Sequence, residues 1–275
     1  MNRFLIETNW RFIDQSLTML THSPLESFAM DDTLCHVTGH ASSPPVIRTW
    51  VHQESVVLGI QDHRLPHIEE GMALLRARGY EPIVRNSGGL AVVLDPGVLN
   101  VSIVFSESEP TSIDQAFSYM VDLVKAIFPK VADQIEAYEI VGSYCPGTFD
   151  LSIGGKKFAG ISQRRMQNGI AVQIYLCIEG SGSERAALIR DFYAVSLQGE
   201  KTKFTYPTVV PEVMASMQEL TGEPMTVADV NIRIQQLLMA WNSNTVLLPL
   251  QESELALYAH YLERIYKRNA VLLKG

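Results

Sequence analysis

The sequence predicts an α/β protein of the α+β type, with mixed, mostly antiparallel sheets flanked by helices. Short β-prone runs separated by glycine turns dominate residues 46–178, and only two helical patterns interrupt them. Beyond residue 180 the pattern is helical. The chain has 275 residues, of which 47% are hydrophobic, so it can bury a full core. We expect an α/β core over residues 1–180 and a helical C-terminal region over residues 181–275, packed on that core.

The first predicted helix spans residues 23–39. Ser23 and Glu26 match a capping box, Pro24 takes the first helical position, and Gly39 offers a C-terminal stop. Its apolar spacing indicates one buried face, and we expect the acidic pair at 31–32 to be exposed or to cap the helix. Two strands then follow within residues 46–59, a helix over 68–78 and a strand over 81–85.

The apolar runs at 90–94 and 99–105 are predicted to form a hairpin, because Asp95, Pro96 and Gly97 supply turn residues between them. Residues 112–128 follow as a helix closed by Pro129. Strands are expected over 137–141, 149–153, 157–162 and 170–178. Glycine pairs and Asn-Gly turns join them at 154–155 and 168–169. Four helices complete the chain, over 183–196, 210–220, 226–241 and 253–268.

Composition excludes several classes of function. A net charge of −8 and a pI near 5.4 argue against general nucleic-acid binding, which needs a basic face. No run of about 18 uncharged apolar residues suggests a membrane span, and the N-terminus lacks a signal-peptide core. The 3 cysteines form neither a disulfide framework nor a zinc pattern, so we expect a cytoplasmic protein without a metal. Cys35 and Cys177 lie among apolar residues and are predicted to be small core side chains.

Cys145 is the main candidate for chemistry. It precedes Lys157 by twelve positions in the stretch GSYCPGTFDLSIGGKKFAGISQRR, which starts at Gly142. A free thiol has a pKa of about 8.5, so a nucleophilic cysteine needs a nearby cation or base. A lysine on the next hairpin could supply that charge. A buried structural cysteine beside surface lysines explains the same spacing.

A glycine turn at residues 85–95, RNSGGLAVVLD, is the second signal. Paired glycines let a backbone approach a ligand closely and present amide hydrogens to it. The turn lacks the third glycine of a dinucleotide fingerprint and the lysine of a phosphate loop. Taken alone, it is equally consistent with a tight β-turn.

The segments at 85–89, 97–102 and 150–165 together resemble the biotin and lipoate protein ligase superfamily, over roughly residues 25–260. This similarity implies a biotin/lipoate protein ligase-like catalytic fold with a helical C-terminal extension, and a catalytic role for the core. The GSYCPG and DLSI pieces resemble the octanoyl amidotransferase branch. Such enzymes move an octanoyl group from the octanoylated H protein of the glycine cleavage system to lipoyl domains of 2-oxoacid dehydrogenase E2 subunits, through a cysteine thioester and without a cofactor.

The resemblance assigns roles to particular residues. Cys145 corresponds to the acyl-accepting nucleophile, and Lys157, rather than Lys156, to the lysine at the reaction centre. An octanoyl chain buried at about 0.8 kcal/mol per CH2 would gain roughly 5 kcal/mol, so a narrow apolar slot is expected. The implied substrate-binding residues are Arg85, Ser87, Gly88 and Gly89. Candidates for the slot are Leu90, Val92, Val101 and Ile103.

Three alternatives stay open from the sequence. An octanoyltransferase could draw on octanoyl-acyl carrier protein, an ATP-dependent lipoate-protein ligase could activate a free acid, and a non-enzymatic scaffold could retain the fold. Asn86, Leu90 and Leu94 replace the arginine, glycine and histidine usual in the ligases, which weakens the case for an acyl-adenylate.

Partner recognition has a faint signal. Lys156, Arg164 and Arg165 could form a local basic patch that steers an acidic carrier domain, or simply a solvated charged hairpin.

Overall fold

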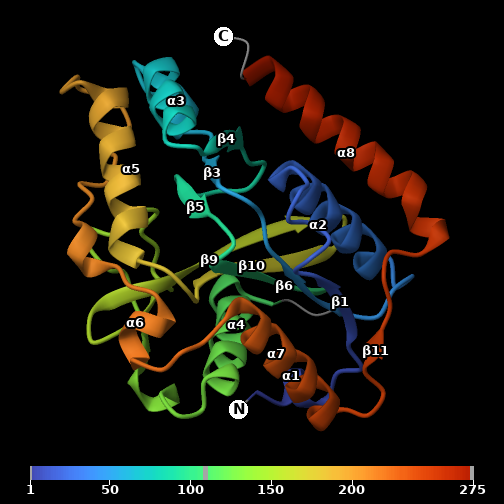
Figure 1. The fold of residues 1–275 in the computed structure, drawn as a ribbon. Helices are drawn as coiled ribbons and strands as arrows, with labels where there is room; N and C mark the ends of the chain where they lie inside the picture. Colours follow the sequence, from blue (N-terminus) through green and yellow to red (C-terminus); the bar gives the residue numbers. More distant parts are fainter. Residues whose placement is uncertain (1, 108–110, 273–275) are drawn as a thin grey trace.

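The computed structural model describes residues 2–107 and 111–272, and over these residues two sheets lie between helices (Figure 1). The larger sheet has 8 strands in the order β11-β1-β2-β6-β10-β9-β8-β7, and the smaller has 3 in the order β4-β3-β5. The predicted α+β class is confirmed: most pairings are antiparallel, and the parallel ones are β11–β1, β1–β2 and β3–β4. The strands of the large sheet are β1 (Arg11–Gln15), β2 (Val46–Trp50), β6 (Val98–Ser106), β7 (Ile135–Ala137), β8 (Leu151–Ile153), β9 (Lys156–Met166), β10 (Gly169–Cys177) and β11 (Val246–Leu247). Those of the small sheet are β3 (Ser55–Leu58), β4 (Glu81–Val84) and β5 (Val92–Leu94).

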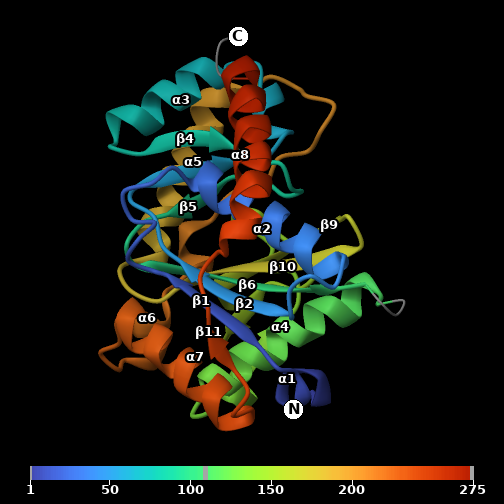
Figure 2. The same cartoon turned by 90° about the vertical axis from the view of Figure 1, so that its right-hand side faces the viewer.

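Helices cover both faces of the large sheet (Figures 1 and 2). On one face lie α1 (Arg3–Glu7), α4 (Ile113–Ile127) and α7 (Val227–Trp241), which share one apolar cluster with the sheet. On the other face α2 (Pro24–Gly39) packs on the strands, and α8 (Glu252–Leu272) crosses over α2. The small sheet stands above this second face beside α3 (Ile68–Ala77) and α5 (Gly182–Leu197), and α6 (Met217–Thr221) lies near the end of α5. None of the helices described is both long and apolar enough to span a bilayer.

The predicted start of α2 is correct, but its cap is made differently. Ser23 Oγ accepts a hydrogen bond from the backbone N–H of Leu25, while the Glu26 carboxylate contacts His22 Nδ1 at 2.8 Å. The expectation for the acidic pair on this helix is wrong. Asp31 is fully buried and pairs with Arg48 of β2 at 2.8 Å, and Asp32 is also buried. Helical periodicity misses such residues because a buried ion pair places charges on the apolar face.

The predicted hairpin over residues 90–105 is also wrong. β5 pairs with β3 in the small sheet, whereas β6 pairs with β2 and β10 in the large one. The turn therefore carries the chain from one sheet to the other. Asp95 anchors it by accepting two hydrogen bonds from Arg185 of α5, at 2.6 and 2.7 Å, and one from the Gly97 N–H at 2.8 Å.

Residues 210–220 form two short helices instead of the single predicted one: the 3-10 turn Pro211–Val213 and then α6. Between them the chain runs beside β9, where Met214 forms a bridge with Lys157 and the Ala215 N–H donates to the Lys157 carbonyl at 3.0 Å. This stretch thus helps to hold the backbone of a predicted site residue. No sequence pattern predicts α1, β1 or the two-residue β11, although each contributes to the large sheet or to the layer of helices that covers it.

Candidate active site

Cys145 lies in the loop between β7 and β8, in a left-handed backbone conformation with φ of 45°. Such a conformation is uncommon for a residue other than glycine and requires support from the surroundings. Its Sγ accepts hydrogen bonds from the Leu90 N–H at 3.2 Å and from Arg85 Nη2 at 3.4 Å. The thiol is partly exposed. The structure therefore brings the cysteine next to the glycine turn, although Leu90 and Cys145 are 55 residues apart in the sequence.

Gly89 lets the glycine turn approach the sulfur closely, because it has no side chain at the point of contact. Gly89 has φ of 104°, and a Cβ there would lie 2.0 Å from Arg85 Nη2 and 3.1 Å from Cys145 Sγ. Gly59, which ends the neighbouring strand region, would place a Cβ 1.9 Å from the Gly89 carbonyl oxygen. Close backbone approach is the usual reason for glycine at such positions. Here it lets Arg85 and Leu90 surround the thiol.

Lys157 is fully buried at the start of β9, and its ammonium points to the backbone of the cysteine loop. Nζ donates to the carbonyl oxygens of Cys145 at 2.9 Å and Tyr144 at 3.0 Å, and pairs with Asp150 Oδ1 at 2.8 Å. Nζ also lies 3.3 Å from Ser143 Oγ, so four oxygens surround an ammonium that has three N–H donors. The neighbouring Lys156 is exposed. The cation that contacts Sγ is Arg85, whereas the sequence had suggested a lysine for that position.

Asp150 ties Lys157 to the rest of the loop. Its Oδ2 accepts from the N–H groups of Gly147 at 3.2 Å and Ile140 at 3.3 Å. Burial raises the pKa of the Asp150 carboxyl, and the charge and hydrogen bond of Lys157 oppose that rise. The carboxylate and the ammonium together close the loop that presents Cys145.

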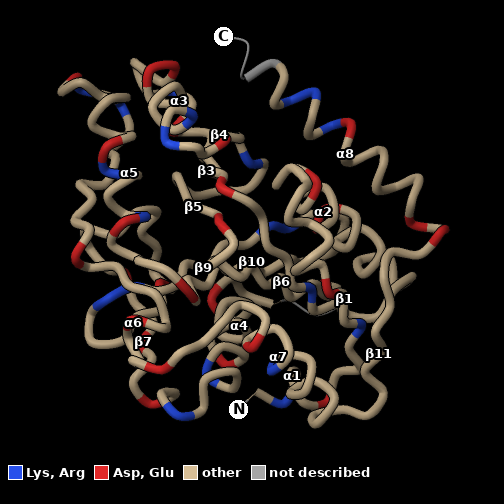
Figure 3. Tube along the Cα trace, viewed as in Figure 1, with Lys and Arg blue, Asp and Glu red and all other residues tan. Residues whose placement is uncertain are grey.

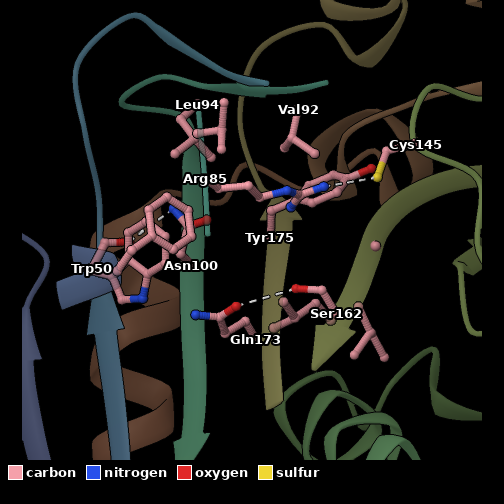
Figure 4. A pocket seen from close by; sticks show the side chains of 14 residues that line it. Trp50, Arg85, Val92, Leu94, Asn100, Cys145, Ser162, Gln173 and Tyr175 are labelled. Atoms are coloured by element: carbon pink, nitrogen blue, oxygen red, sulfur yellow. Dashed lines mark hydrogen bonds between the residues drawn. The ribbon is translucent and has the colours of Figure 1, made fainter. Parts of the chain in front are cut away.

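An apolar pocket opens beside Cys145 and runs between the two sheets (Figure 4). We call it the inner pocket; it is narrow, with a cavity volume of about 50 Å³. Arg85 lines it, as does Val92. Val101 and Ile103 do not: both belong to the cluster on the opposite face of the large sheet, because the side chains of β6 alternate between its faces. Its other apolar and aromatic walls are Phe28, Trp50, Val57, Leu94 and Tyr175, and its polar walls are Asn100, Ser162 and Gln173.

A second depression, the outer pocket, lies on the exposed side of the glycine turn. Ser87, Gly88 and Gly89 line it, so three of the predicted substrate-binding residues face this pocket. Leu90 and Pro146 line it as well, next to residues that touch the inner pocket. The opposite wall comes from Gln61, Arg64, Phe204, Thr205, Tyr206 and Pro207. Cys145 and Pro146, neighbours in the chain, thus line the inner and the outer pocket respectively.

Asp62 supports the glycine turn and had no sequence signal. Its Oδ2 accepts from the Gly59 N–H at 2.7 Å, and its Oδ1 accepts from the Tyr193 hydroxyl at 2.8 Å. Tyr193 in turn accepts from the Ala91 N–H at 3.4 Å. Burial raises the pKa of Asp62 to about 6. The residues come from a 3-10 turn and from α5, so only the tertiary fold brings them under the turn.

The predicted basic patch does not form as a single surface. Lys156 stands at the start of β9 and Arg164 and Arg165 near its end, roughly 27 Å apart along an extended strand. Arg164 forms a salt bridge with Asp32, and Arg165 one with Glu107. Figure 3 shows basic and acidic residues interspersed along the trace.

The predicted core cysteines are confirmed, since Cys35 and Cys177 are buried and free. In the part of the chain that the structure describes, no group of three or more histidine, cysteine, aspartate or glutamate side chains is placed to hold a metal ion.

Residues 23–238 match the model of the lipoyl protein ligase A/B catalytic domain. The chain belongs to this family. It is also similar, at 62% identity over 275 residues, to an "Octanoyl-[GcvH]:protein N-octanoyltransferase" of Lysinibacillus sphaericus, covering 100% of this chain and 99% of the relative. Relatives with the same name in Geobacillus kaustophilus and Staphylococcus aureus are 50% and 46% identical, over 100% and 99% of this chain and 97% of each relative. The resemblance noted from the sequence is confirmed.

Solved structures of the family agree on the fold. The chain is similar to a lipoate-protein ligase A bound with ATP, with a TM-score of 0.68 and 17% identity over 94% of each chain. It is similar also to a bipartite lipoate protein ligase from Thermoplasma acidophilum, with a TM-score of 0.63 and 17% identity over 94% of this chain and 93% of the other. At this identity the likeness establishes the lipoate-protein ligase fold.

Proposed function

We propose that this protein is an N-octanoyltransferase of protein lipoylation. The donor is the octanoylated H protein of the glycine cleavage system, and the acceptor is a lysine of the lipoyl domains of 2-oxoacid dehydrogenase E2 subunits. Full-length relatives at 46–62% identity support the activity and the donor by their names. The structural observation that supports it most is the Cys145 sulfur, which two N–H donors hold beside the inner pocket, while the next residue, Pro146, lines the outer pocket.

Cys145 is the proposed nucleophile. Arg85 and the Leu90 N–H both donate to Sγ, so the sulfur is held in place between a cation and a backbone amide. An amide is a poor acyl donor, so a covalent intermediate that divides one hard step into two helps its transfer. The partly exposed thiol at the mouth of the inner pocket can meet the carbonyl of a chain that lies in the pocket.

The reaction then proceeds in two balanced steps. Sγ attacks the octanoyl carbonyl of the donor amide, the C–N bond breaks, and the donor lysine leaves with the proton that the thiol has lost. In the second step the amine of the acceptor lysine attacks the thioester, the S–C bond breaks, and the thiol regains a proton. No ATP and no cofactor enter either step.

Lys157 is the second proposed catalytic residue. Its ammonium lies 2.9 Å from the carbonyl oxygen of Cys145, the residue that carries the reacting sulfur. We propose that it exchanges one of its two backbone acceptors for the acyl oxygen and stabilises the charge that develops there. Asp150 would keep the ammonium in place during the exchange.

The inner and outer pockets divide the substrate between them. The acyl chain would occupy the inner pocket, where burial of about six methylenes gains roughly 5 kcal/mol. The lysine that bears the chain would enter from the outer pocket, across Ser87, Gly88 and Gly89. We further propose a cytoplasmic location, where the free thiol of Cys145 stays reduced.

Intact mass measurement tests this proposal. The protein is incubated with octanoylated H protein, without ATP, and the expected product carries one octanoyl group, which Cys145→Ala abolishes. Addition of a lipoyl domain should then discharge the adduct onto the domain. An adduct that forms only from octanoyl-acyl carrier protein would contradict the donor, a strict requirement for ATP would favour a ligase, and no transfer from any donor would leave a scaffold.

A further inference from the structure

On the pocket-facing side of the large sheet, a row of side chains that includes two aromatic rings lies next to a row that is entirely polar. Side chains in register across β9, β10, β6 and β2 form rows, because residues two apart on a strand share a face. One row consists of Gly160, Tyr175, Asn100 and Trp50. The next row is polar on all four strands and consists of Ser162, Gln173, Ser102 and Arg48.

A single carboxylate from α2 fixes this polar row. Asp31 Oδ2 accepts from Gln173 Nε2 at 2.5 Å and from Ser102 Oγ at 2.8 Å, and Asp31 Oδ1 accepts from Arg48 Nη1 at 2.8 Å. Asp31, Ser102 and Arg48 are fully buried, and Gln173 is nearly so. A buried carboxylate with this many donors holds them in one geometry, since a donor that turns away gives up a hydrogen bond that no water replaces.

Two residues of this row line the inner pocket, and Gln173 is the more firmly held of the two. Its amide nitrogen is bound to Asp31, and its amide oxygen accepts from Ser162 Oγ at 3.4 Å. Both Gln173 and Ser162 line the inner pocket, and in Figure 4 they lie across the pocket from Cys145, below Tyr175. Because both ends of the amide are bound, the side chain cannot swing aside for a ligand without losing these bonds.

We propose that Gln173 and Ser162, held by Asp31, are the end stop of the acyl slot and set the longest acyl chain that Cys145 accepts. The inference rests on the proposed acyl transfer to Cys145. A hydrocarbon chain gains free energy only along the apolar walls, and its methyl end would meet a polar surface that cannot withdraw. The two side chains act on chain length alone, because neither contacts the thiol among the bonds described for Cys145.

Two substitutions should move the limit in opposite directions. Gln173→Ala removes the amide and opens the space that it occupied, whereas Ser162→Leu fills the slot from the adjacent strand. Gln163→Ala is the matched control, because Gln163 is the next residue of β9, faces the other side of the sheet and does not line the pocket. The fold of each variant is checked by its thermal transition.

The measurement is the rate of Cys145 acylation, by intact mass, from H protein that carries hexanoyl, octanoyl, decanoyl or dodecanoyl groups. We expect the wild type and Gln163→Ala to discriminate against the decanoyl and dodecanoyl donors. In Gln173→Ala the decanoyl rate relative to octanoyl should rise about tenfold, the effect of two further buried methylenes. In Ser162→Leu the preference should shift to hexanoyl by a similar factor.

The outcomes separate this inference from the function on which it rests. If the wild type forms no adduct with any acylated H protein, the proposed function fails. If the wild type forms adducts but Gln173→Ala and Ser162→Leu keep its chain-length profile, the end stop is wrong and the function stands. Gln173 and Ser162 lie on different strands. If one variant misfolds, the chain-length profile of the other still tests the end stop.

Discussion

The two ends of the inner pocket are built in different ways. The Cys145 end consists of loops, with positive φ at Cys145 and Gly89 and with side chains bound to backbone groups. The Gln173 end consists of strands in register and one helix, joined by side-chain bonds to Asp31. The first end holds a reactive group in a strained position, and the second holds a wall in place. Chemistry should therefore be sensitive at the first end, and stability and selectivity at the second.

Loss of Lys157 should produce the largest change. Lys157→Ala removes the proposed oxyanion donor and leaves Asp150 buried without its cation. We expect acylation of Cys145 to fall about 10²- to 10³-fold, and the free energy of unfolding to fall by about 3–5 kcal/mol. Intact mass kinetics and urea unfolding measure the two effects.

The exposed neighbour gives the control for Lys157: Lys156→Ala should change neither quantity. The double variant Asp150→Leu/Lys157→Met should regain much of the stability, since replacing both partners of a buried pair costs less than removing one. It should not regain acylation. A normal acylation rate in folded Lys157→Ala would contradict the catalytic role and leave Lys157 as a residue that positions the loop.

Loss of Arg48 tests the opposite end. Arg48→Met removes the partner of the fully buried Asp31 and should lower the free energy of unfolding by about 3–5 kcal/mol, by urea denaturation. Octanoyl transfer per folded molecule should change far less than in Lys157→Ala. Asp31→Leu/Arg48→Met should recover part of the loss. If a folded Arg48→Met variant lost acylation as completely as Lys157→Ala, the proposal that the Cys145 end governs chemistry and the Gln173 end governs stability would be wrong.

The sequence predicts the loop end of the pocket better than the end that is built from strands and a helix. Cys145 and Lys157 are close together in the chain, so a local motif and its family resemblance predict them as a pair, whereas the part that Asp150 plays becomes visible only in the structure. The wall at the other end unites Asp31, Arg48 and Gln173 from three separate elements, and only the sheet register brings them together. The buried charge of Asp31 opposes the helical pattern from which an exposed position was expected.

The sheet assignment of β5 and β6 shows the same limit. Alternation and turn residues predicted two strands there, and both exist. Their partners depend on where Arg185, 90 residues along the chain, anchors Asp95. A hairpin would put all three valine and isoleucine candidates beside the slot. Because β5 and β6 belong to different sheets, Val92 lines the pocket, whereas Val101 and Ile103 lie on the opposite face of the large sheet.

Two buried groups, His52 against the Trp50 ring and Asp62 bonded to Gly59, should respond to pH with opposite signs. Burial, and next the charge of Arg48, lower the pKa of His52 to about 4, so the unfolded state binds more protons below pH 6.5 and His52 costs stability as the pH falls from 6.5 toward 4. Burial raises the pKa of Asp62, under the glycine turn, to about 6, so here the native state binds more protons and stability falls as the pH rises from about 4 to 6. Each effect amounts to about 1.4 kcal/mol per pH unit inside its window.

Single substitutions separate these opposing slopes. The free energy of urea unfolding is measured between pH 4.5 and 7.5 for wild type, His52→Gln and Asp62→Asn. Relative to wild type, His52→Gln should lose less stability on acidification, and Asp62→Asn should lose more. Parallel curves for all three proteins would show that neither group titrates differently in the folded and unfolded states.

The smallest effect on stability, and the sharpest test of the loop end, is expected from Gly89→Ala. A Cβ at this position would lie 2.0 Å from Arg85 Nη2, the movable end of a side chain, so Arg85 should yield and withdraw from the thiol. With φ of 104° the substitution should also cost about 1–2 kcal/mol of backbone strain. We expect acylation of Cys145 to slow about tenfold, by intact mass kinetics. Gly79→Ala is the matched control, because Gly79 has φ of 85° and no atom within 4 Å of an added Cβ. It should lose similar stability with normal acylation, and equal slowing in both variants would mean that strain, and not the Arg85 contact, limits the reaction.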